Sequence, residues 1–223
     1  MTRITLALCL LISNCATAGL PHEAAAFKPT ADKSLLELLL GTPAAVEGCP
    51  ENAQLLLTEI DEASAAKFVS QVAACKGRAI TVEINSPGGS VIAAFDIQKA
   101  IERHDKPVYC VVDGMAASAA FVTLQSCAHR YMTDRSLLMA HEASIGSKGQ
   151  EVEHNNAAAA LRAVNWGMAE HCSKRMGITH AEFASRVSNG QEWYLSQLDA
   201  LRENAIDGRA ESVSEIAAMA SEG

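Results

Sequence analysis

The chain has 223 residues, of which 49% are hydrophobic and 20% are charged. This composition is typical of a globular domain with a sizeable core, and it excludes a fibrous or disordered chain. The formal net charge of −8 and the aromatic content of 4% argue against nucleic-acid partners. An acidic surface repels phosphates, and base stacking needs aromatic platforms.

The first 18 residues have the features of a secretory signal peptide. Arg3 supplies a positive charge, Ile4–Ile12 is an apolar run, and Ala16-Thr17-Ala18 has the small-x-small form of a signal-peptidase site. The apolar run is too short for a stable membrane span. We therefore predict a bacterial protein that is periplasmic or secreted and loses residues 1–18. Lipidation at Cys15 and a buried N-terminal helix are the alternatives.

Strands and helices alternate along the chain after an irregular lead-in at 19–50. Apolar runs predict strands at 55–60, 79–84, 107–112, 137–140 and 193–195, and helical spacing predicts helices at 62–74, 91–101 and 115–127. This alternation is typical of β-α-β units, so we expect an α/β fold with a mostly parallel sheet. Residues 51–208 form one predicted domain without repeats or linkers.

A long alanine-rich helix is predicted at about 149–177. It contains few large apolar residues, so a projecting element or a contact between subunits fits it better than a place in the core. We therefore expect a homo-oligomer. The end of the chain, 209–223, is predicted to be an acidic, weakly helical tail.

Five cysteines remain after removal of the signal peptide. An exported protein can form disulfides, but an odd number leaves at least one thiol without a partner in the chain. Cys49–Cys75 and Cys127–Cys172 are possible bridges, with the connectivity left open, and Cys110 is expected to be a small core residue. No cysteines or histidines have the spacing of a metal site, so we predict no metal and no cofactor.

Ser118 follows a predicted strand and lies among small residues, Ala116, Ala117, Ala119 and Ala120. In the first turn of a helix, free N–H groups and the positive end of the helix dipole favour negative charge. Small neighbours also let a substrate backbone approach. The same spacing is typical of a close-packed helix, so the pattern alone leaves open both a nucleophile and a packing role for Ser118.

A glycine-rich turn, Asn85-Ser86-Pro87-Gly88-Gly89, follows the second predicted strand. Gly88 and Gly89 can adopt positive φ and turn their N–H groups toward a ligand. Together with the N–H of Ala119, such groups can form an oxyanion hole. An ordinary strand-to-helix turn has the same composition, and the third glycine of a dinucleotide-binding fingerprint is missing.

His141 follows the apolar run Leu137–Ala140, at the end of a predicted strand. Active sites of open α/β sheets collect at such strand ends. A neutral imidazole there can take a serine proton and pass it to a leaving group. None of the other six histidines is marked in this way by its neighbours, and His180 is expected at the surface.

Four motifs together resemble those of the proteolytic subunit of the Clp protease, which has the ClpP/crotonase-like fold. They are Leu56–Asp61, Ile84–Val91, Gly114–Ser118 and Met139–His141, and Gly149-Gln150 resembles the start of the family's "handle", which makes contacts between rings of subunits. The resemblance covers about residues 52–208. It implies an α/β fold of repeated β-α-β units with a mostly parallel sheet and a projecting handle helix.

The resemblance also implies a mechanism. Ser118 would attack a peptide carbonyl while His141 accepts its proton, and the N–H groups of Gly88 or Gly89 and of Ala119 would hold the oxyanion. Water would then resolve an acyl-enzyme. The implied substrate is a peptide or unfolded protein. Outside the cytoplasm the enzyme would act without the ATP-driven unfoldase that serves the family's cytosolic members.

The third member of the implied triad departs from the family's pattern. The family has an aspartate shortly before an aromatic-aliphatic-Ser/Thr-Ala segment, and the counterpart Tyr194–Gln197 brings Glu192 to that position. A glutamate can orient a histidine, although it is one methylene longer than aspartate. Asn189 is the fallback, and Glu192 can equally be a solvated surface acid.

Two other functions fit the same motifs. The chain could be a catalytically weak or inactive ClpP-like protein with a binding or assembly role. It could also be a crotonase-type acyl-CoA enzyme, which uses paired N–H groups on a thioester and needs no Ser–His pair. An exported protein would not meet coenzyme A, which disfavours the second of these functions.

Overall fold

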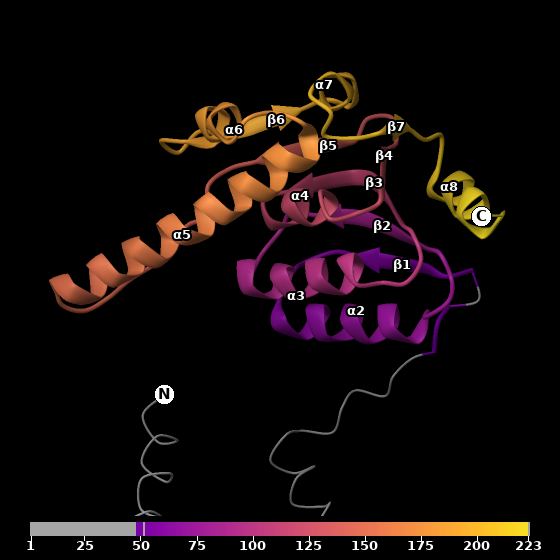
Figure 1. The fold of residues 1–223 in the computed structure, drawn as a ribbon, viewed down its shortest axis with the longest axis horizontal. Helices are drawn as coiled ribbons and strands as arrows, with labels where there is room; N and C mark the ends of the chain where they lie inside the picture. The colour runs from indigo at the N-terminus through magenta and orange to yellow at the C-terminus, as the bar shows by residue number, and fades with distance from the viewer. Residues whose placement is uncertain (1–47, 51, 223) are drawn as a thin grey trace, which may run out of the picture. The chain divides into compact units, whose positions relative to one another are not determined.

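A seven-stranded sheet is the centre of the part of the chain that the computed structural model describes, residues 48–50 and 52–222. The predicted signal peptide at 1–18, with Cys15, and most of the lead-in at 19–50 lie outside the described residues. Five strands pair in the order β1-β2-β3-β4-β7, all parallel, and β5 and β6 extend the sheet beside the far end of β3 (Figure 1). The strands are β1 Gln54–Leu57, β2 Ile80–Ser86, β3 Val108–Ala117, β4 His129–Met132, β5 Leu137–Ala140, β6 Trp193–Leu195 and β7 Gly208–Arg209.

Seven helices connect and cover these strands within the described residues. They are α2 Glu62–Ala74, α3 Val91–Glu102, α4 Ala119–Leu124, α5 Glu151–Met176, α6 His180–Val187, α7 Gln197–Arg202 and α8 Val213–Glu222. Polar caps fix their starts: Asp61 forms a capping box with Ser64 at α2, and the Ser90 side chain accepts the Ala93 N–H at α3. The fold is the predicted ClpP/crotonase-like α/β fold with a mostly parallel sheet.

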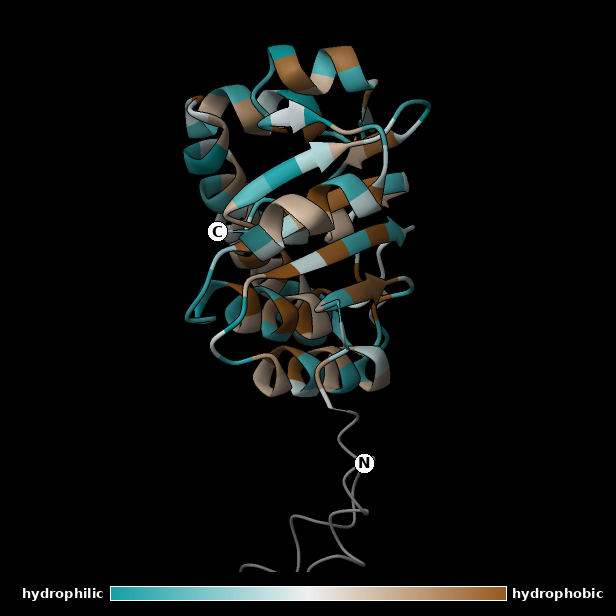
Figure 2. Ribbon diagram, turned by 90° about the vertical axis from the view of Figure 1, so that its right-hand side faces the viewer, coloured by the Kyte–Doolittle hydropathy of each residue, from teal (hydrophilic) through white to brown (hydrophobic). Residues whose placement is uncertain are grey.

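The central strand, β3, begins with a continuous apolar run because both of its faces are buried. Val108, Cys110 and Val112 of β3 are at most 2% exposed and pack in the main core, whereas Val111 points to the other face. There it meets Val213 and Ile216 of α8, so the acidic C-terminal segment covers the second face of the sheet. Figure 2 shows that the strands, like the helices, carry both hydrophobic and hydrophilic residues.

Two expectations about local structure were wrong. The helix predicted at 115–127 begins only at Ala119, because residues 115–117 continue β3 and pair with residues 137–139 of β5. Strand pairing here overrides the helix propensity of alanine. The polar strand β4 was not predicted at all, since its sequence, His-Arg-Tyr-Met, lacks an apolar run.

The helix α5 is the predicted projecting handle (Figure 1). Only residues near its C-terminal end, Met168, Ala169, Cys172, Ser173 and Met176, are buried. The N-terminal half extends away from the sheet, as its lack of a continuous apolar face indicates. None of the described helices is both long and apolar enough to cross a bilayer.

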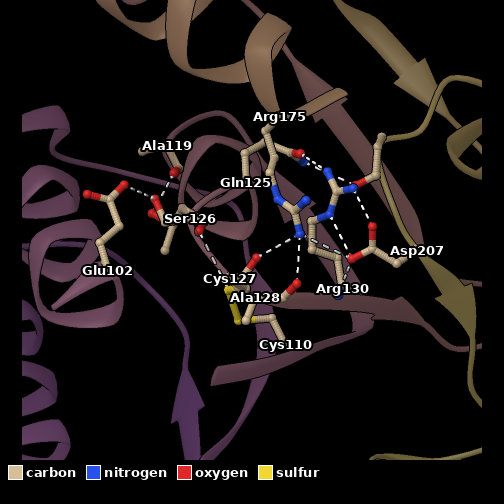
Figure 3. Close-up of a disulfide and its surroundings, with 12 residues drawn as sticks. Glu102, Cys110, Ala119, Gln125, Ser126, Cys127, Ala128, Arg130, Arg175 and Asp207 are labelled. Carbon is tan, nitrogen blue, oxygen red and sulfur yellow. Dashed lines mark hydrogen bonds and ion pairs between the residues drawn. A yellow bond between two sulfur atoms is a disulfide. The ribbon is translucent and has the colours of Figure 1, made fainter. Parts of the chain in front are cut away.

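The disulfides are Cys49–Cys75 and Cys110–Cys127, and Cys172 is free and buried. The first is one of the two possible bridges. The second overturns both the possible pair Cys127–Cys172 and the expectation that Cys110 is a plain core residue. Cys127 lies after α4 with its Cα 6.0 Å from that of Cys110 on β3 (Figure 3), a distance that fits a disulfide. Burial raises the pKa of the Cys172 thiol, so this residue is unreactive.

An ion pair between the buried Arg130 and the partly exposed Asp207 lies beside that disulfide (Figure 3). The Arg130 side chain is 2% exposed, and its Nε donates to Asp207 Oδ2 at 3.1 Å. The Arg130 backbone N–H donates to the same oxygen at 2.8 Å, and Arg175 reaches it at 3.3 Å. Burial raises the pKa of Asp207, but the hydrogen bonds and charge of Arg130 and the charge of Arg175 outweigh it and keep that pKa below its ordinary value.

Replacing this carboxylate is expected to destabilise the fold. Asp207→Asn should lower the free energy of unfolding at pH 7 by about 2 kcal/mol, because it leaves the buried Arg130 charge without its counter-ion, although solvent screens the carboxylate, which is 34% exposed. The pKa of Asp207 is lowered by folding, so its contribution is present above the ordinary value of 3.8 and is lost as the pH falls through the folded-state pKa. Urea titrations of the wild type and of Asp207→Asn, repeated at pH values from 7 down to below 3.8, should therefore show that the difference between their free energies of unfolding becomes smaller as the pH falls.

A matched control is Asp96→Asn, because Asp96 pairs with Lys99 at 3.1 Å on the exposed face of α3. This change should cost less than about 1 kcal/mol. Equal losses of unfolding free energy in the two variants would contradict a structural role for the Arg130–Asp207 pair.

Candidate active site

Ser118 lies at the junction between β3 and α4 rather than inside a helix. It is the N-cap of α4, with φ of 56° and ψ of −121°. Positive φ in a residue with a side chain costs about 1–3 kcal/mol, and it persists only where surrounding contacts fix the backbone. Here the Ser118 N–H donates to the carbonyl oxygen of Met139 at 2.8 Å, which ties the turn to β5.

His141 directly follows β5, the strand that pairs with the end of β3. The pair Ala117–Met139 in that register brings the residues after both strands to the same edge of the sheet. The Nε2 atom of His141 lies 2.7 Å from Ser118 Oγ, and both side chains are half-buried. This distance is within reach of direct proton transfer between a hydroxyl and an imidazole.

The glycine-rich turn after β2 packs against Ser118. A Cβ atom on Gly88 would lie 2.6 Å from the Ala117 carbonyl oxygen and 2.8 Å from Ser118 Cβ. A Cβ atom on Gly89 would overlap the carbonyl oxygen of Ile60. Both glycines also have positive φ, 97° and 144°. Only glycine therefore lets the turn come this close to the serine.

The backbone N–H groups of this region are not equivalent. The Gly88 N–H donates to Ser86 Oγ at 3.1 Å, so it is already engaged. The N–H groups of Gly89 and Ala119 have no hydrogen-bond acceptor within the described part of the chain. Of the three predicted oxyanion donors, Gly89 and Ala119 are thus the two whose N–H groups remain available to a ligand.

Glu192 and Asn189, predicted as partners of His141, do not contact it in this structure. The Glu192 carboxylate accepts a hydrogen bond from the Tyr194 hydroxyl at 2.7 Å, which raises the pKa of that hydroxyl. Glu192 is nevertheless close in topology, because Ala140 pairs with Trp193 and the next positions along these antiparallel strands are His141 and Glu192. Asn189 adopts φ of 60° and reaches only Ser188, at 3.4 Å.

Asn165, which no sequence motif marks, supports the segment after His141. The Asn165 side chain comes from α5, and its Oδ1 accepts the N–H of Ala143 at 2.8 Å. This bond ties the extended segment after His141 to the handle helix. No local pattern marks a lone asparagine in the middle of a long helix, so only the tertiary structure could reveal it.

Among the described residues, no three His, Cys, Asp or Glu side chains gather as metal ligands would. The site thus consists of a serine hydroxyl, an imidazole and two backbone N–H groups at the ends of parallel strands. Together with the sheet order and the projecting helix, it defines an α/β protein of the ClpP/crotonase-like class.

Comparison with known proteins narrows this class. The profile of the family described as "Clp protease" matches residues 50–211. The chain belongs to the Clp protease family.

Several bacterial relatives carry the description "ATP-dependent Clp protease proteolytic subunit". Subunit 3 of Rhodococcus jostii is 31% identical over 169 residues, 73% of this chain and 83% of the relative. Subunit 1 of Corynebacterium glutamicum is 29% identical over 157 residues, 67% of this chain and 74% of the relative. Subunit 1 of Chlamydia caviae is 45% identical over 73 residues, so the chain spans only 38% of that relative's length.

Proposed function

We propose that this protein is a serine peptidase that hydrolyses peptide bonds through an acyl-enzyme intermediate. The observation that carries the proposal is the 2.7 Å separation of Ser118 Oγ and His141 Nε2. As Oγ attacks the carbonyl carbon of the substrate, its proton passes to Nε2 and a tetrahedral oxyanion forms. The imidazolium then protonates the leaving amine, and a water molecule, activated by the same imidazole, releases the acid product.

The oxyanion is stabilised by the N–H groups of Gly89 and Ala119. Ala119 is the residue after the nucleophile, and Gly89 belongs to the turn whose Gly88 touches Ser118. Two such donors that are already fixed in place need no rearrangement as the charge develops. The support for this assignment is that both N–H groups lack acceptors within the described residues.

Glu192 is proposed as the group that orients His141 during turnover. The register of β5 and β6 supports this role, since positions 141 and 192 follow the pair Ala140–Trp193. For Glu192 to reach the ring, its carboxylate must leave the hydroxyl of Tyr194. Tyr194 is 52% exposed, so a change in its side-chain rotamer meets little obstruction.

This competition gives opposite predictions for two variants. Glu192→Gln should lower kcat about 100-fold or more, because the amide no longer stabilises the imidazolium. Tyr194→Phe should leave kcat unchanged or raise it several-fold, since it removes the hydrogen bond that holds Glu192 away from His141. Steady-state kinetics on a peptide substrate would measure kcat for both variants. Asn189→Ala is the control, and its kcat should equal that of the wild type. A Glu192→Gln variant with full activity would remove Glu192 from the mechanism.

We also propose that the protein acts outside the cytoplasm, without an ATPase partner, on peptides or unfolded proteins. The two disulfides support this location, because they form and persist in oxidising compartments. The exposed half of α5 supports self-assembly of the chain. Cell fractionation and N-terminal sequencing of the mature protein test the export. Recovery of an unprocessed, reduced chain from the cytosol would contradict it.

Labelling with a fluorophosphonate probe tests the peptidase assignment itself. The wild-type protein should be labelled, and Ser118→Ala should not be. Ser86→Ala is a useful companion, because this serine lies near the same turn but its hydroxyl accepts the Gly88 N–H. Labelling that persists in Ser118→Ala would exclude this nucleophile. A folded wild type that is never labelled would favour the non-catalytic function, which the Glu192–Tyr194 bond also fits.

A further inference from the structure

Strand β3 changes partners along its length, and a β-bulge lies at the change. Its first part pairs with β4 and its last part pairs with β5. The register against β2 shifts at the same place, because Val112 lies opposite Ile84 whereas Ala116 lies opposite Ser86. Two steps along β2 therefore match four steps along β3. The two inserted residues, Asp113-Gly114, form a bulge in the strand that leads to the active site.

The bulge determines where Ser118 lies along the sheet. A strand rises about 3.3 Å per residue, so two inserted residues move all later residues of β3 back by about 7 Å relative to β2. With this offset Ala117 and Ser118 lie against Gly88 of the glycine-rich turn. A regular strand would carry Ser118 about 7 Å past that turn. The approach of the serine to the glycine-rich turn therefore depends on the bulge.

A chain of hydrogen bonds fixes the two bulge residues. The Gly114 N–H donates to Ser136 Oγ at 2.9 Å, and Ser136 Oγ lies 2.8 Å from Thr133 Oγ1. Thr133 Oγ1 donates to Asp113 Oδ1 at 2.7 Å. Each hydroxyl has a single hydrogen, so the Ser136 hydroxyl must donate to Thr133 when the Thr133 hydrogen points to the carboxylate. The chain thus begins and ends on the bulge, and every donor in it has an acceptor.

Thr133 and Ser136 belong to the turn that joins β4 to β5, and they are only 5% and 6% exposed. The Thr133 N–H also donates to the Val112 carbonyl oxygen at 2.9 Å, directly before the bulge. Removal of one buried hydroxyl would leave its neighbours in the chain without partners, and the bonds of such a chain strengthen one another. The turn therefore holds the bulge as a unit.

We propose that Thr133 and Ser136 are positioning residues for catalysis. Their hydroxyl groups fix the bulge from which β3 continues to Ser118, and their own turn continues through β5 to His141. The two halves of the catalytic pair are thus aligned where their strands begin to run together. Neither residue touches the substrate or the reacting atoms. This inference rests on the proposed peptidase function, because it takes Ser118 as the nucleophile.

The first test compares variants that keep or remove a hydroxyl. Thr133→Val has a similar shape but cannot donate to Asp113, whereas Thr133→Ser keeps the donor. On a peptide substrate, Thr133→Val should lower kcat at least about tenfold with KM within about twofold, since a small displacement of reacting groups costs rate more than binding. Thr133→Ser should keep kcat within about threefold of the wild type. Ser136→Ala should behave like Thr133→Val, and the double variant should lose little more than either, because both act through one chain.

Ser173→Ala is the matched control. Ser173 is also a buried serine, 2% exposed, but its hydroxyl donates to the Glu170 carbonyl oxygen within α5. Thermal unfolding should show a comparable loss of stability for Ser173→Ala and Ser136→Ala. Only Ser136→Ala should lose kcat, which separates positioning from a general loss of stability.

Amide hydrogen exchange follows the bulge without turnover. In Ser136→Ala the Gly114 N–H loses its acceptor, so its exchange should become at least about tenfold faster. Exchange at Gly114 should stay at the wild-type rate in Ser173→Ala and in Thr133→Ser. An unchanged rate in Ser136→Ala would show that the hydroxyl does not fix the bulge.

The outcomes separate the two proposals. Faster exchange at the bulge with full kcat in Ser136→Ala would overturn the positioning role, while probe labelling of Ser118 would still support the peptidase. A folded wild type that is neither labelled nor active would overturn the peptidase, whatever the exchange at the bulge. Equal losses of kcat in Thr133→Val and Thr133→Ser, or in Ser136→Ala and Ser173→Ala, would also refute the positioning role, because the hydroxyl groups of the chain would not be the cause.

Discussion

His141→Ala is expected to lower kcat/KM for a peptide substrate by about 10³-fold, within the range that a general base contributes. The reason is that His141 Nε2 lies 2.7 Å from Ser118 Oγ, and no other titratable side chain among the described residues forms a hydrogen bond with this hydroxyl. Without the imidazole, the hydroxyl must lose its proton to solvent. The residual rate of the variant should therefore rise with pH, as the concentration of hydroxide increases.

The control for this prediction is His154→Ala. Its ring contacts Ser147 at 2.6 Å, so it also resembles a Ser–His pair, but it lies on the exposed part of the handle. Its loss should leave kcat/KM within about twofold, since nothing near it corresponds to the paired N–H donors. A full loss of activity in both variants would point to a structural cause, and retained activity in His141→Ala would remove the histidine from the mechanism.

The position of the Ser–His pair could be predicted because it depends on short motifs at strand ends. The carboxyl ends of parallel strands lie at the same edge of a sheet. A serine that follows β3 and a histidine that follows β5 therefore lie close together when these two strands pair. The exact backbone of Ser118 could not be predicted. Its positive φ depends on the bond to Met139, and residues 115–117 have the composition of a helix.

Features that depend on long-range contacts were missed or only partly predicted. Cys110 pairs with Cys127 and not with a distant partner, because the turn after α4 returns the chain to β3, and no local signal reveals this. Strand β4 carries a buried arginine, Arg130, whose counter-ion Asp207 is 77 residues away. Asn165 and His180 likewise lie near the segment of His141 only because α5 and α6 pack beside the end of β5, and this packing is not visible in the local sequence.

In the proposed mechanism Glu192 is the acid of the triad, at a position where the family resemblance implies an aspartate. Glu192, the residue before β6, accepts a hydrogen bond from the hydroxyl of Tyr194. The glutamate side chain is long enough to reach either the hydroxyl of Tyr194 or the imidazole of His141. The aspartate of the family's pattern is one methylene shorter and reaches less far. A peptidase whose triad is completed only part of the time would be slow, which suits a dedicated cleavage better than general degradation.

Gly88→Ala is expected to inactivate the enzyme and to weaken the fold. The added methyl group would come within 2.6 Å of the Ala117 carbonyl oxygen and 2.8 Å of Ser118 Cβ, and φ of 97° adds strain for any side chain. Strain and overlap together should lower the free energy of unfolding by about 3 kcal/mol. Relief of the overlap must move either the turn with Gly89 or the serine itself. Because a displacement of about 1 Å costs about 10²-fold in rate, kcat/KM should fall by at least that factor in protein that is still folded.

The control for this variant is Gly77→Ala, which has nearly the same backbone strain without the overlap. Gly77 has φ of 83°, but no atom lies within 4 Å of the position that a Cβ would occupy. It should lose about 1 kcal/mol of stability and keep its activity. Thermal unfolding, and kinetics measured well below both transitions, separate the two effects. If Gly88→Ala were as active as Gly77→Ala, the glycine turn would not be part of the site, and the oxyanion would need other donors than Gly89.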